Sequence, residues 1–285
     1  MTEFVLANEP ALRLGVFISM LVGVAMWEWI APRRSLSYGR LTRWPSNLGI
    51  VALNTVVLRL LFPVAAVGTA WYAGAQGWGV FNVLDLPYWL SVVLSVVILD
   101  FVIYLQHVMV HAVPVLWRLH RMHHTDLDYD VTTGARFHPL EIVLSMAIKL
   151  TALTLIGAPP VAVVIFEVVL NATAMFNHGN IRIPRGIDRV LRLFVVTPDM
   201  HRVHHSVVVE ETNSNFGFNL PWWDRLLGTY RDQPAAGHEN MTIGIEQFRD
   251  GKYLRLDWLL IQPFMDEVGD YAITGSKASP KEKNS

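Results

Sequence analysis

The sequence contains no cysteine and few charged residues. Without cysteine, the chain has no disulfide framework, no thiolate metal site, no iron–sulfur cluster and no cysteine nucleophile. Charged residues make up only 16% of its 285 residues, whereas an ordinary soluble domain has about 25%. Hydrophobic residues make up 52% and the mean hydropathy is +0.34, so the composition favours a membrane protein. The net charge of −1 gives no indication of a nucleic-acid partner.

Five apolar stretches have the composition of membrane-spanning helices. They run from Leu12 to Pro32, Leu48 to Gly74, Tyr88 to His111, Leu140 to Gly157 and Pro159 to Phe176. The first three reach the roughly 20 residues that a helix needs to cross a bilayer core. The last two are shorter and are joined by a Gly-Ala-Pro-Pro turn, which breaks helices. We therefore expect an all-α integral membrane protein with four to five transmembrane helices, the last two forming a hairpin.

The positions of the basic residues predict an orientation in the membrane. Four arginines follow the first stretch, three follow the third and four follow the hairpin: Arg33, Arg34, Arg40, Arg43, Arg118, Arg121, Arg136, Arg182, Arg185, Arg189 and Arg192. The linkers 75–87 and 157–160 contain no Lys or Arg. This asymmetry predicts an N-terminus outside and a C-terminal region in the cytoplasm. Since no basic segment precedes the first stretch, we expect it to be a retained helix and not a cleaved signal peptide.

Four charged residues lie inside the predicted spans, where an unpaired charge is costly. Arg59 and Asp100 are each 12 residues from the cytoplasmic ends of their stretches, and Lys149 and Glu167 are each nine residues from Ala158. Antiparallel helices would place the members of each pair at equal depth, so we predict two ion pairs. The alternative is that each residue lines a water-filled cavity separately.

The eleven histidines are unevenly distributed. None occurs in the first 106 residues, ten lie between His107 and His205, and His238 stands apart. Nine of the ten form four patches: HxxxH at His107 and His111, HxxHH at His120, His123 and His124, a single His178, and a second HxxHH at His201, His204 and His205.

The spacing within each patch predicts metal binding. Helical residues three or four apart lie on one face, with β-carbons about 5–6 Å apart, so each box can aim two or three imidazoles at one point. Neutral imidazole suits iron, zinc, copper or nickel, whereas magnesium and calcium prefer oxygen ligands. Nine imidazoles are too many for one ion, and they are enough for two ions with positions left open for a small ligand.

Polar neighbours of the boxes are candidates for orienting the imidazoles. Asp100, Tyr104, His107 and His111 share one face of a helix. Asp100 or Tyr104 is therefore expected to hold the second ring nitrogen of a ligand, although Asp100 could serve Arg59 alone. Asp126 and Asp199, beside the two HxxHH boxes, are further candidates of this kind.

The sequences of these boxes and of the residues around them resemble those of the fatty acid hydroxylase/sterol desaturase superfamily. The matching segments are Asp100-Phe-Val-Ile-Tyr-Leu-Gln-His, Trp117-Arg-Leu-His-Arg-Met-His-His, Arg136-Phe-His-Pro, Asn177-His-Gly-Asn, Thr197-Pro-Asp-Met-His-Arg-Val-His-His and Trp223-Asp-Arg-Leu-Leu-Gly-Thr-Tyr. The resemblance covers about residues 90–230.

The resemblance implies a non-haem di-iron centre. Carried onto this chain, its metal ligands would be His107, His111, His120, His123, His124, His178, His201, His204 and His205. Some relatives have a further histidine one turn before His178, where this chain has Ala174. His138 is a candidate for an additional ligand or for a residue that supports a ligand. Asn180 is a further candidate for a supporting residue. His238 is expected on the surface.

The resemblance also implies an activity: an oxygen-dependent hydroxylase or monooxygenase acting on the aliphatic part of a membrane lipid, such as a fatty acyl, sterol-like or ether lipid. A desaturase of the same superfamily is the nearest alternative. Iron is expected in the native enzyme, although zinc is possible in purified material because imidazole ligands do not distinguish the two metals. Because no segment resembles a cytochrome b5, flavin or ferredoxin module, an external electron-transfer protein is expected as a partner.

Two alternatives of other classes remain at the level of the sequence. A membrane metal-binding or transport protein would place its ligands near the bilayer midplane, whereas these histidines are predicted at one face of the membrane. A di-zinc hydrolase would use the same imidazoles. For the enzyme, we expect three regions: N-terminal transmembrane helices at 1–88, a histidine-box catalytic domain at 89–232 with a cytoplasmic helical cap, and a C-terminal cytoplasmic tail at 233–285. Residues 275–285 are rich in lysine and serine and are predicted to be disordered.

Overall fold

The computed structural model describes residues 2–84, 86–266 and 269–274. The predicted disorder of residues 275–285 lies outside them. All regular elements of this part are helices: α1 Thr2–Ala7, α2 Glu9–Ile30, α3 Arg40–Leu61, α4 Ala65–Ala75, α5 Val80–Val83, α6 Tyr88–Ala112, α7 Pro114–His124, η1 Thr133–Ala135, α8 Pro139–Ile156, α9 Pro160–Asn177, α10 Arg185–Leu191, α11 Pro198–His204, α12 Val209–Thr212, α13 Trp222–Leu227, α14 Gly237–Asn240, η2 Gly251–Leu254, α15 Leu256–Ile261 and η3 Gln262–Phe264. The all-α prediction is confirmed.

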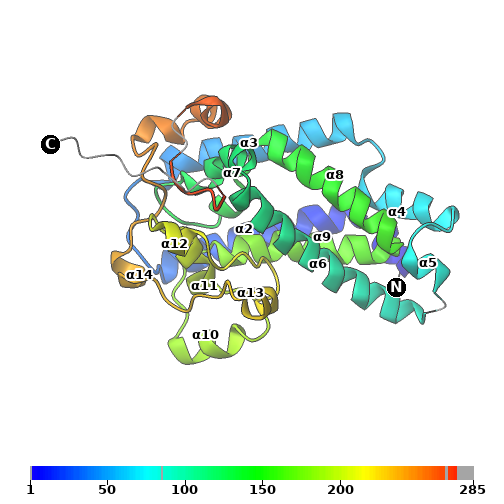
Figure 1. Cartoon of the computed structure of the whole chain (residues 1–285). Helices are drawn as coiled ribbons and strands as arrows, with labels where there is room; N and C mark the ends of the chain where they lie inside the picture. The colour runs from blue at the N-terminus through cyan, green and yellow to red at the C-terminus, as the bar shows by residue number, and fades with distance from the viewer. Residues whose placement is uncertain (1, 85, 267–268, 275–285) are drawn as a thin grey trace.

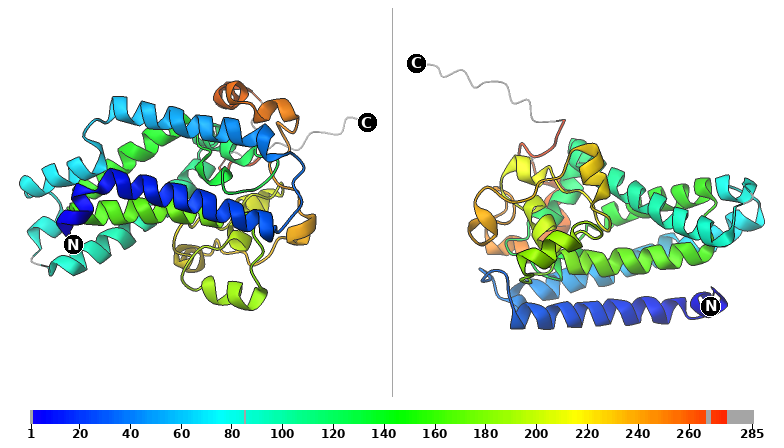
Figure 2. Two further views of the ribbon diagram at one scale, coloured as in Figure 1. Left: turned by 180° about the vertical axis from the view of Figure 1, so that it is seen from behind. Right: turned by 90° about the horizontal axis from the view of Figure 1, so that it is seen from below.

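Five helical segments are long and apolar enough to cross a membrane: 9–30, 40–83, 88–112, 139–156 and 160–177. The long helices run side by side as one bundle, with the N-terminus, α4 and α5 at one end and the short helices α10 to α14 at the other (Figures 1 and 2). We call residues 114–138 and 178–274 the cap. Within the bundle α9 packs against α2 and α6, and α8 packs against α3, α4 and α6.

The second apolar stretch differs from its prediction. A single span from 48 to 74 was expected, but α3 begins earlier, at Arg40, and ends at Leu61, and α4 begins at Ala65. The break lies at Pro63, which has no N–H to continue the helical ladder and forces the preceding residue out of the helical region. Phe62 accordingly has φ −129° and ψ 66°.

The predicted hairpin between α8 and α9 is confirmed. Gly157 ends α8 in the left-handed conformation, with φ 73°, and Pro160 begins α9 where its missing N–H costs nothing. Lys149 and Glu167 form the predicted ion pair across this hairpin, and Arg13 of α2 also pairs with Glu167.

The other predicted pair is wrong. Arg59 is exposed on α3, and no ion pair joins it to Asp100 in the described part of the chain. Asp100 instead accepts hydrogen bonds from the indole of Trp223, at 2.7 Å, and the backbone N–H of Leu220, at 3.3 Å. Equal depth in the membrane was therefore not enough to predict an ion pair between Arg59 and Asp100. Depth does not fix how each helix is rotated about its own axis, and so does not fix which way the side chains point.

Candidate metal centre

Nine histidines converge where the bundle meets the cap. His107 and His111 lie on the last turns of α6, His120, His123 and His124 on the last turn of α7, and His178 caps the end of α9. His201, His204 and His205 lie on or directly after α11, a short helix that begins with a Thr-Pro pair. There Thr197 accepts from the N–H of Met200 and Pro198 occupies the first helical position. Every one of the nine side chains is no more than 2% exposed.

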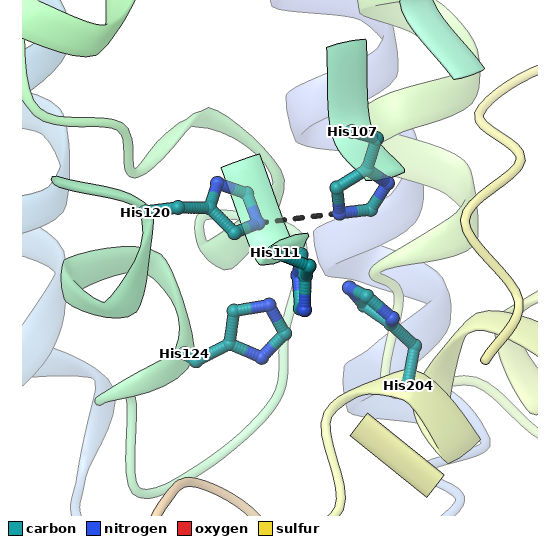
Figure 3. Close-up of side chains that lie close together, drawn as sticks. All are labelled: His107, His111, His120, His124 and His204. Atoms are coloured by element: carbon teal, nitrogen blue, oxygen red, sulfur yellow. Dashed lines mark hydrogen bonds between the residues drawn. The ribbon is translucent and has the colours of Figure 1, made fainter. Parts of the chain in front are cut away.

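The nine side chains form two groups. The five-histidine group contains His107, His111, His120, His124 and His204, and the four-histidine group contains His123, His178, His201 and His205. Within each group, one nitrogen from every ring lies within 4.8 Å of all the others. Figure 3 shows the five rings of the first group turned towards one another.

Each HxxHH box is divided between the two groups, which the sequence did not predict. In the first box, His120 and His124 belong to the five-histidine group, while His123 belongs to the other. The second box is divided the other way: His201 and His205 belong to the four-histidine group, and His204 belongs to the five-histidine group. The boxes therefore tie the two groups together, and the rings of His124 and His205 stack at 4.6 Å between them.

The outer ring nitrogens of six histidines are fixed by hydrogen bonds. Four of the Nδ1 atoms bond backbone carbonyls: His107 to Phe216 at 2.7 Å, His123 to Arg136 at 3.2 Å, His178 to Ala174 at 2.7 Å and His204 to Ser214 at 2.7 Å. The other two bond side-chain oxygens: His111 to Asn213 Oδ1 at 3.1 Å and His120 to Glu141 Oε1 at 2.6 Å. Since each partner is an acceptor, Nδ1 carries the proton and Nε2 is left with a free lone pair.

The inward nitrogens have no proton donors to satisfy them. Nε2 of His107 faces Nε2 of His120 at 3.2 Å, and Nε2 of His178 faces Nε2 of His123 at 3.2 Å. With the protons held on Nδ1, each of these contacts sets two lone pairs against each other. Within the described part of the chain, Nε2 of His111 and His204 and both ring nitrogens of His124, His201 and His205 are buried without a hydrogen-bond partner. Such orphaned acceptors are costly unless a cation binds them, so both groups fit a metal that prefers neutral imidazole.

Burial keeps these imidazoles neutral. Burial, reinforced by the neighbouring rings, lowers the pKa of His123, His124, His201 and His205 well below the ordinary histidine value. Burial lowers the pKa of His178 to about 3. Neutral rings are the form that coordinates metal ions.

Several predicted supporting residues lie elsewhere. The hydroxyl groups of Tyr104 and Thr229 form a hydrogen bond at 2.9 Å, and among the residues that the structure describes neither Tyr104 nor Asp100 bonds a histidine. Asp199 pairs with Arg202 and with Arg33. Asp100, Tyr104 and Asp199 each have at least one partner from a segment distant in sequence, which spacing along one helix does not reveal.

Three other predicted residues also serve the scaffold. Asn180 exchanges hydrogen bonds with the backbone of Arg34, at 3.0 and 2.9 Å, and so ties the end of α9 to the segment after α2. His138 belongs to neither histidine group: its Nδ1 accepts from the N–H of Leu140 at the start of α8, and its Nε2 lies 3.2 Å from the carbonyl of Leu260. His238, expected on the surface, is only 4% exposed and lies 3.7 Å from Asp199.

Asp126 belongs to a buried charge network beside the four-histidine group. Arg43 of α3 donates from Nε and Nη2 to Asp126, at 2.7 Å each, and from Nη1 to Asp130 at 2.5 Å. Arg136 lies 3.1 Å from Asp126, and its carbonyl holds His123. The network therefore fixes the loop between α7 and α8, which carries a support for one of the histidines.

Three supporting residues, Glu141, Asn213 and Asn177, were not predicted from the sequence. Glu141 is 4% exposed and lies in the first turn of α8. Asn177 Oδ1 lies 2.6 Å from Nδ1 of its neighbour His178. A carboxylate at the predicted inner end of a span was a signal for Glu141, since a charge there needs a partner. Asn213 gave no such signal, because its contact with His111 spans 102 residues.

A cavity of about 250 Å³ lies among the spanning helices beside the five-histidine group. Its walls come from α2, α3, α6, α8 and α9, with Phe17, Leu58, Ile103 and Leu170 among its apolar residues. His107 and His120 line its inner end, together with Phe218 of the cap. The cavity therefore connects an apolar space of the bundle to the candidate metal centre.

The model of the fatty acid hydroxylase family matches residues 92–229, which include all nine histidines of the two groups. Residues 92–229, just under half of the chain, thus match the fatty acid hydroxylase family. This confirms the resemblance in the histidine boxes. An ornithine lipid hydroxylase of Rhizobium tropici is 36% identical over 157 residues, which are 55% of this chain and 46% of that protein.

Two further relatives are similar to part of this chain. The human alkylglycerol monooxygenase is 28% identical over 179 residues, covering 59% of this chain and 36% of that protein. A fatty acid hydroxylase of a Lecanicillium species is 28% identical over 170 residues, covering 55% and 46%. The chain thus spans less than half the length of these curated relatives. No solved structure matches it significantly.

Proposed function

We propose that this protein is a membrane-bound, oxygen-dependent di-iron hydroxylase that acts on the aliphatic part of a membrane lipid. The observation that carries the proposal is the juxtaposition of two groups of inward-facing, neutral imidazoles with an apolar cavity between spanning helices. The names of the relatives, each a lipid hydroxylase or monooxygenase, agree with it.

The five-histidine and four-histidine groups would each hold one iron. When bound, the iron pair would activate dioxygen for attack on an unactivated C–H bond. Glu141 accepts a hydrogen bond from Nδ1–H of His120 and so keeps Nε2 of this ring directed inward. The carbonyls of Phe216 and Ser214 accept in the same way from His107 and His204. Such supports fix the tautomer and the ring orientation on which metal affinity depends.

The cavity would position the lipid chain of the substrate and exclude water from the reacting carbon. An apolar chain that enters between α3, α6 and α8 would lie along Ile103 and Leu58 and end beside His107 and His120. Phe137 stacks on His123 at 4.5 Å, and Phe218 lies 5.0 Å from His107, so aromatic rings shield the imidazoles from water. Holding one carbon in place while excluding water is the protein's share of such chemistry.

The cap is proposed to face the cytoplasm, where an external electron-transfer protein would supply the electrons. The eleven arginines that predict this orientation all follow the cap-side ends of spans or lie in the cap. The gathering of the histidines at one end of the bundle favours an enzyme over a transporter, whose ligands would lie near the bilayer midplane.

Oxygen uptake by protein reconstituted with iron, lipid and a reductase tests the proposal. Lipid extracts would be incubated with ¹⁸O₂, and the products analysed by mass spectrometry. The proposal predicts a lipid that gains one ¹⁸O atom. A product that loses two hydrogens without gaining oxygen would make the protein a desaturase. Zinc-loaded protein that hydrolyses lipid without oxygen uptake would reject the proposal in favour of a hydrolase.

A further inference from the structure

Two short helices of the cap expose large apolar side chains although they are not spanning helices. We call this surface the apolar foot; it comprises Ile187 and Val190 of α10, Phe194, and Trp222, Leu226 and Leu227 of α13. Phe194 is 63% exposed and Leu226 is 73% exposed. The indole of Trp222 donates to the carbonyl of Leu193 at 2.7 Å, which joins α13 to the segment after α10. The foot is therefore one surface built from two segments about 30 residues apart.

The exposed charges on the same two helices are all positive. They are Arg185 and Arg189 on α10 and Arg225 on α13. The two acidic residues of these helices, Asp188 and Asp224, are buried; Asp188 pairs with Arg192, and Asp224 accepts from two backbone N–H groups. Apolar side chains beside exposed arginines are typical of segments that lie in a membrane interface with anionic lipids.

The contact between α13 and α6 places the foot at the depth of the bilayer. The indole of Trp223 donates to Asp100, and its ring lies 4.8 Å from that of Phe101. Asp100 is 12 residues before the cap-side end of α6 at Ala112, which is about 18 Å along a helix. Since the hydrocarbon core is about 30 Å thick, α13 begins beside a part of α6 that lies within the membrane. Figure 1 shows α13 next to α6, with α10 projecting beyond it.

We propose that the apolar foot inserts into the cap-side leaflet of the bilayer, with Arg185 and Arg189 of α10 reaching the lipid phosphates. This surface continues the lipid-facing side of α6, where Leu105 is 46% exposed. The loop that leads into α13 also carries Phe218, which lines the cavity. The foot thus anchors one wall of the cavity to the bilayer. The inference depends on the depth of α13 and holds whatever reaction the centre performs.

The absence of cysteine allows a direct test with single-cysteine variants. Phe194→Cys and Leu226→Cys would be labelled with bimane in protein reconstituted into vesicles of phosphatidylcholine and phosphatidylglycerol. Leu105→Cys on α6 is the lipid-facing reference, and Glu210→Cys, at an exposed position of α12, is the water-facing reference. Quenching would be measured with lipids that carry a nitroxide on the acyl chain and, separately, with aqueous iodide.

The proposal predicts that the labels at 194 and 226 behave like the label at 105. Both would be quenched by the lipid nitroxide, and iodide would quench them at least about threefold less than the label at 210. Iodide quenching at 194 and 226 equal to that at 210, without quenching by the lipid nitroxide, would overturn the proposal and make the foot a surface for a soluble protein partner.

Discussion

The two histidine groups share one ligand chemistry but differ in what surrounds them. Two members of the five-histidine group, His107 and His120, line the cavity, and one of them is held by the carboxylate of Glu141. No member of the four-histidine group lines this cavity in the part of the chain that the structure describes. Its supports are uncharged, namely backbone carbonyls and the amide of Asn177. The difference indicates that an ion in the five-histidine group would be the one beside the substrate.

The largest loss of activity should come from replacing the histidines themselves, and this loss should be similar for the two groups. His204→Ala in one group and His123→Ala in the other should each lower turnover by more than about 100-fold, since even residues that only support a ligand cost 10–100-fold. Metal content per chain should fall in both, with the protein still inserted in the membrane. His138→Asn, outside both groups and still able to cap α8, is the control. Full activity in either alanine variant would refute the ligand assignment.

The next largest effect should come from the charge network beside the four-histidine group. Arg43→Met leaves the buried Asp126 without its two-pronged partner, and breaking a buried pair costs about 3–5 kcal/mol of folding stability. Arg255→Met, which removes an exposed pair with Asp257, should cost less than about 1 kcal/mol. Unfolding of the purified protein in detergent would measure both, and equal losses would contradict the role of the network.

The same network predicts a pH dependence. Burial raises the pKa of the Asp126 carboxyl, but Arg43 and Arg136 outweigh burial and hold it well below its ordinary value. A lowered folded-state pKa stabilises the protein fully above the ordinary aspartate pKa of about 3.9, and this contribution is lost as the pH falls below it. Wild-type protein should therefore lose unfolding free energy in acid, and Arg43→Met should lose less over the same range. Parallel curves would argue against this pair as the cause.

A smaller effect, specific to one group, is expected for Glu141→Gln. An amide supports the His120 imidazole more weakly than a carboxylate does, so activity or metal affinity should fall by about 10–100-fold. The loss should concern one of the two ions. Asp199→Asn is the matched control, because this carboxylate lies beside a histidine box but pairs with arginines. If Glu141→Gln retained both ions as tightly as Asp199→Asn, the proposed asymmetry between the groups would be wrong.

The smallest effect should come from filling the cavity. Ile103→Trp narrows the space beside the five-histidine group and should lower kcat/KM for a lipid by about tenfold, while metal content is unchanged. Leu105→Trp places the same bulk on the exposed side of the same helix and should have little effect. Identical losses in the two variants would show that substrate does not use this cavity.

The features that the sequence predicted well depend on local geometry. The boxes are recognisable because residues three and four apart on a helix share a face, and all nine predicted histidines lie in the two groups. The Lys149–Glu167 pair was predictable because only three residues join the two helices, which fixes their register.

Other features depend on contacts between distant segments, and spacing could not reveal them. The division of each box between two groups depends on how α7 and α11 meet. The partners of Asp100 are Leu220 and Trp223, which lie 120 and 123 residues away, before and on α13. His238 was misplaced for a related reason: a polar segment was expected to be a surface, yet it folds against Asp199 and is buried. Composition predicts that a segment is polar, but not what packs over it.

The central claim is that two histidine groups hold two iron ions next to a lipid cavity. Metal analysis of protein purified from iron-supplied cells, compared between wild type, Glu141→Gln and Arg43→Met under mild chelation, tests it most directly. We expect two iron ions per chain in the wild type, with Glu141→Gln losing one ion first. One ion per chain in the wild type, or zinc alone with no iron even in protein that is active with oxygen, would contradict it.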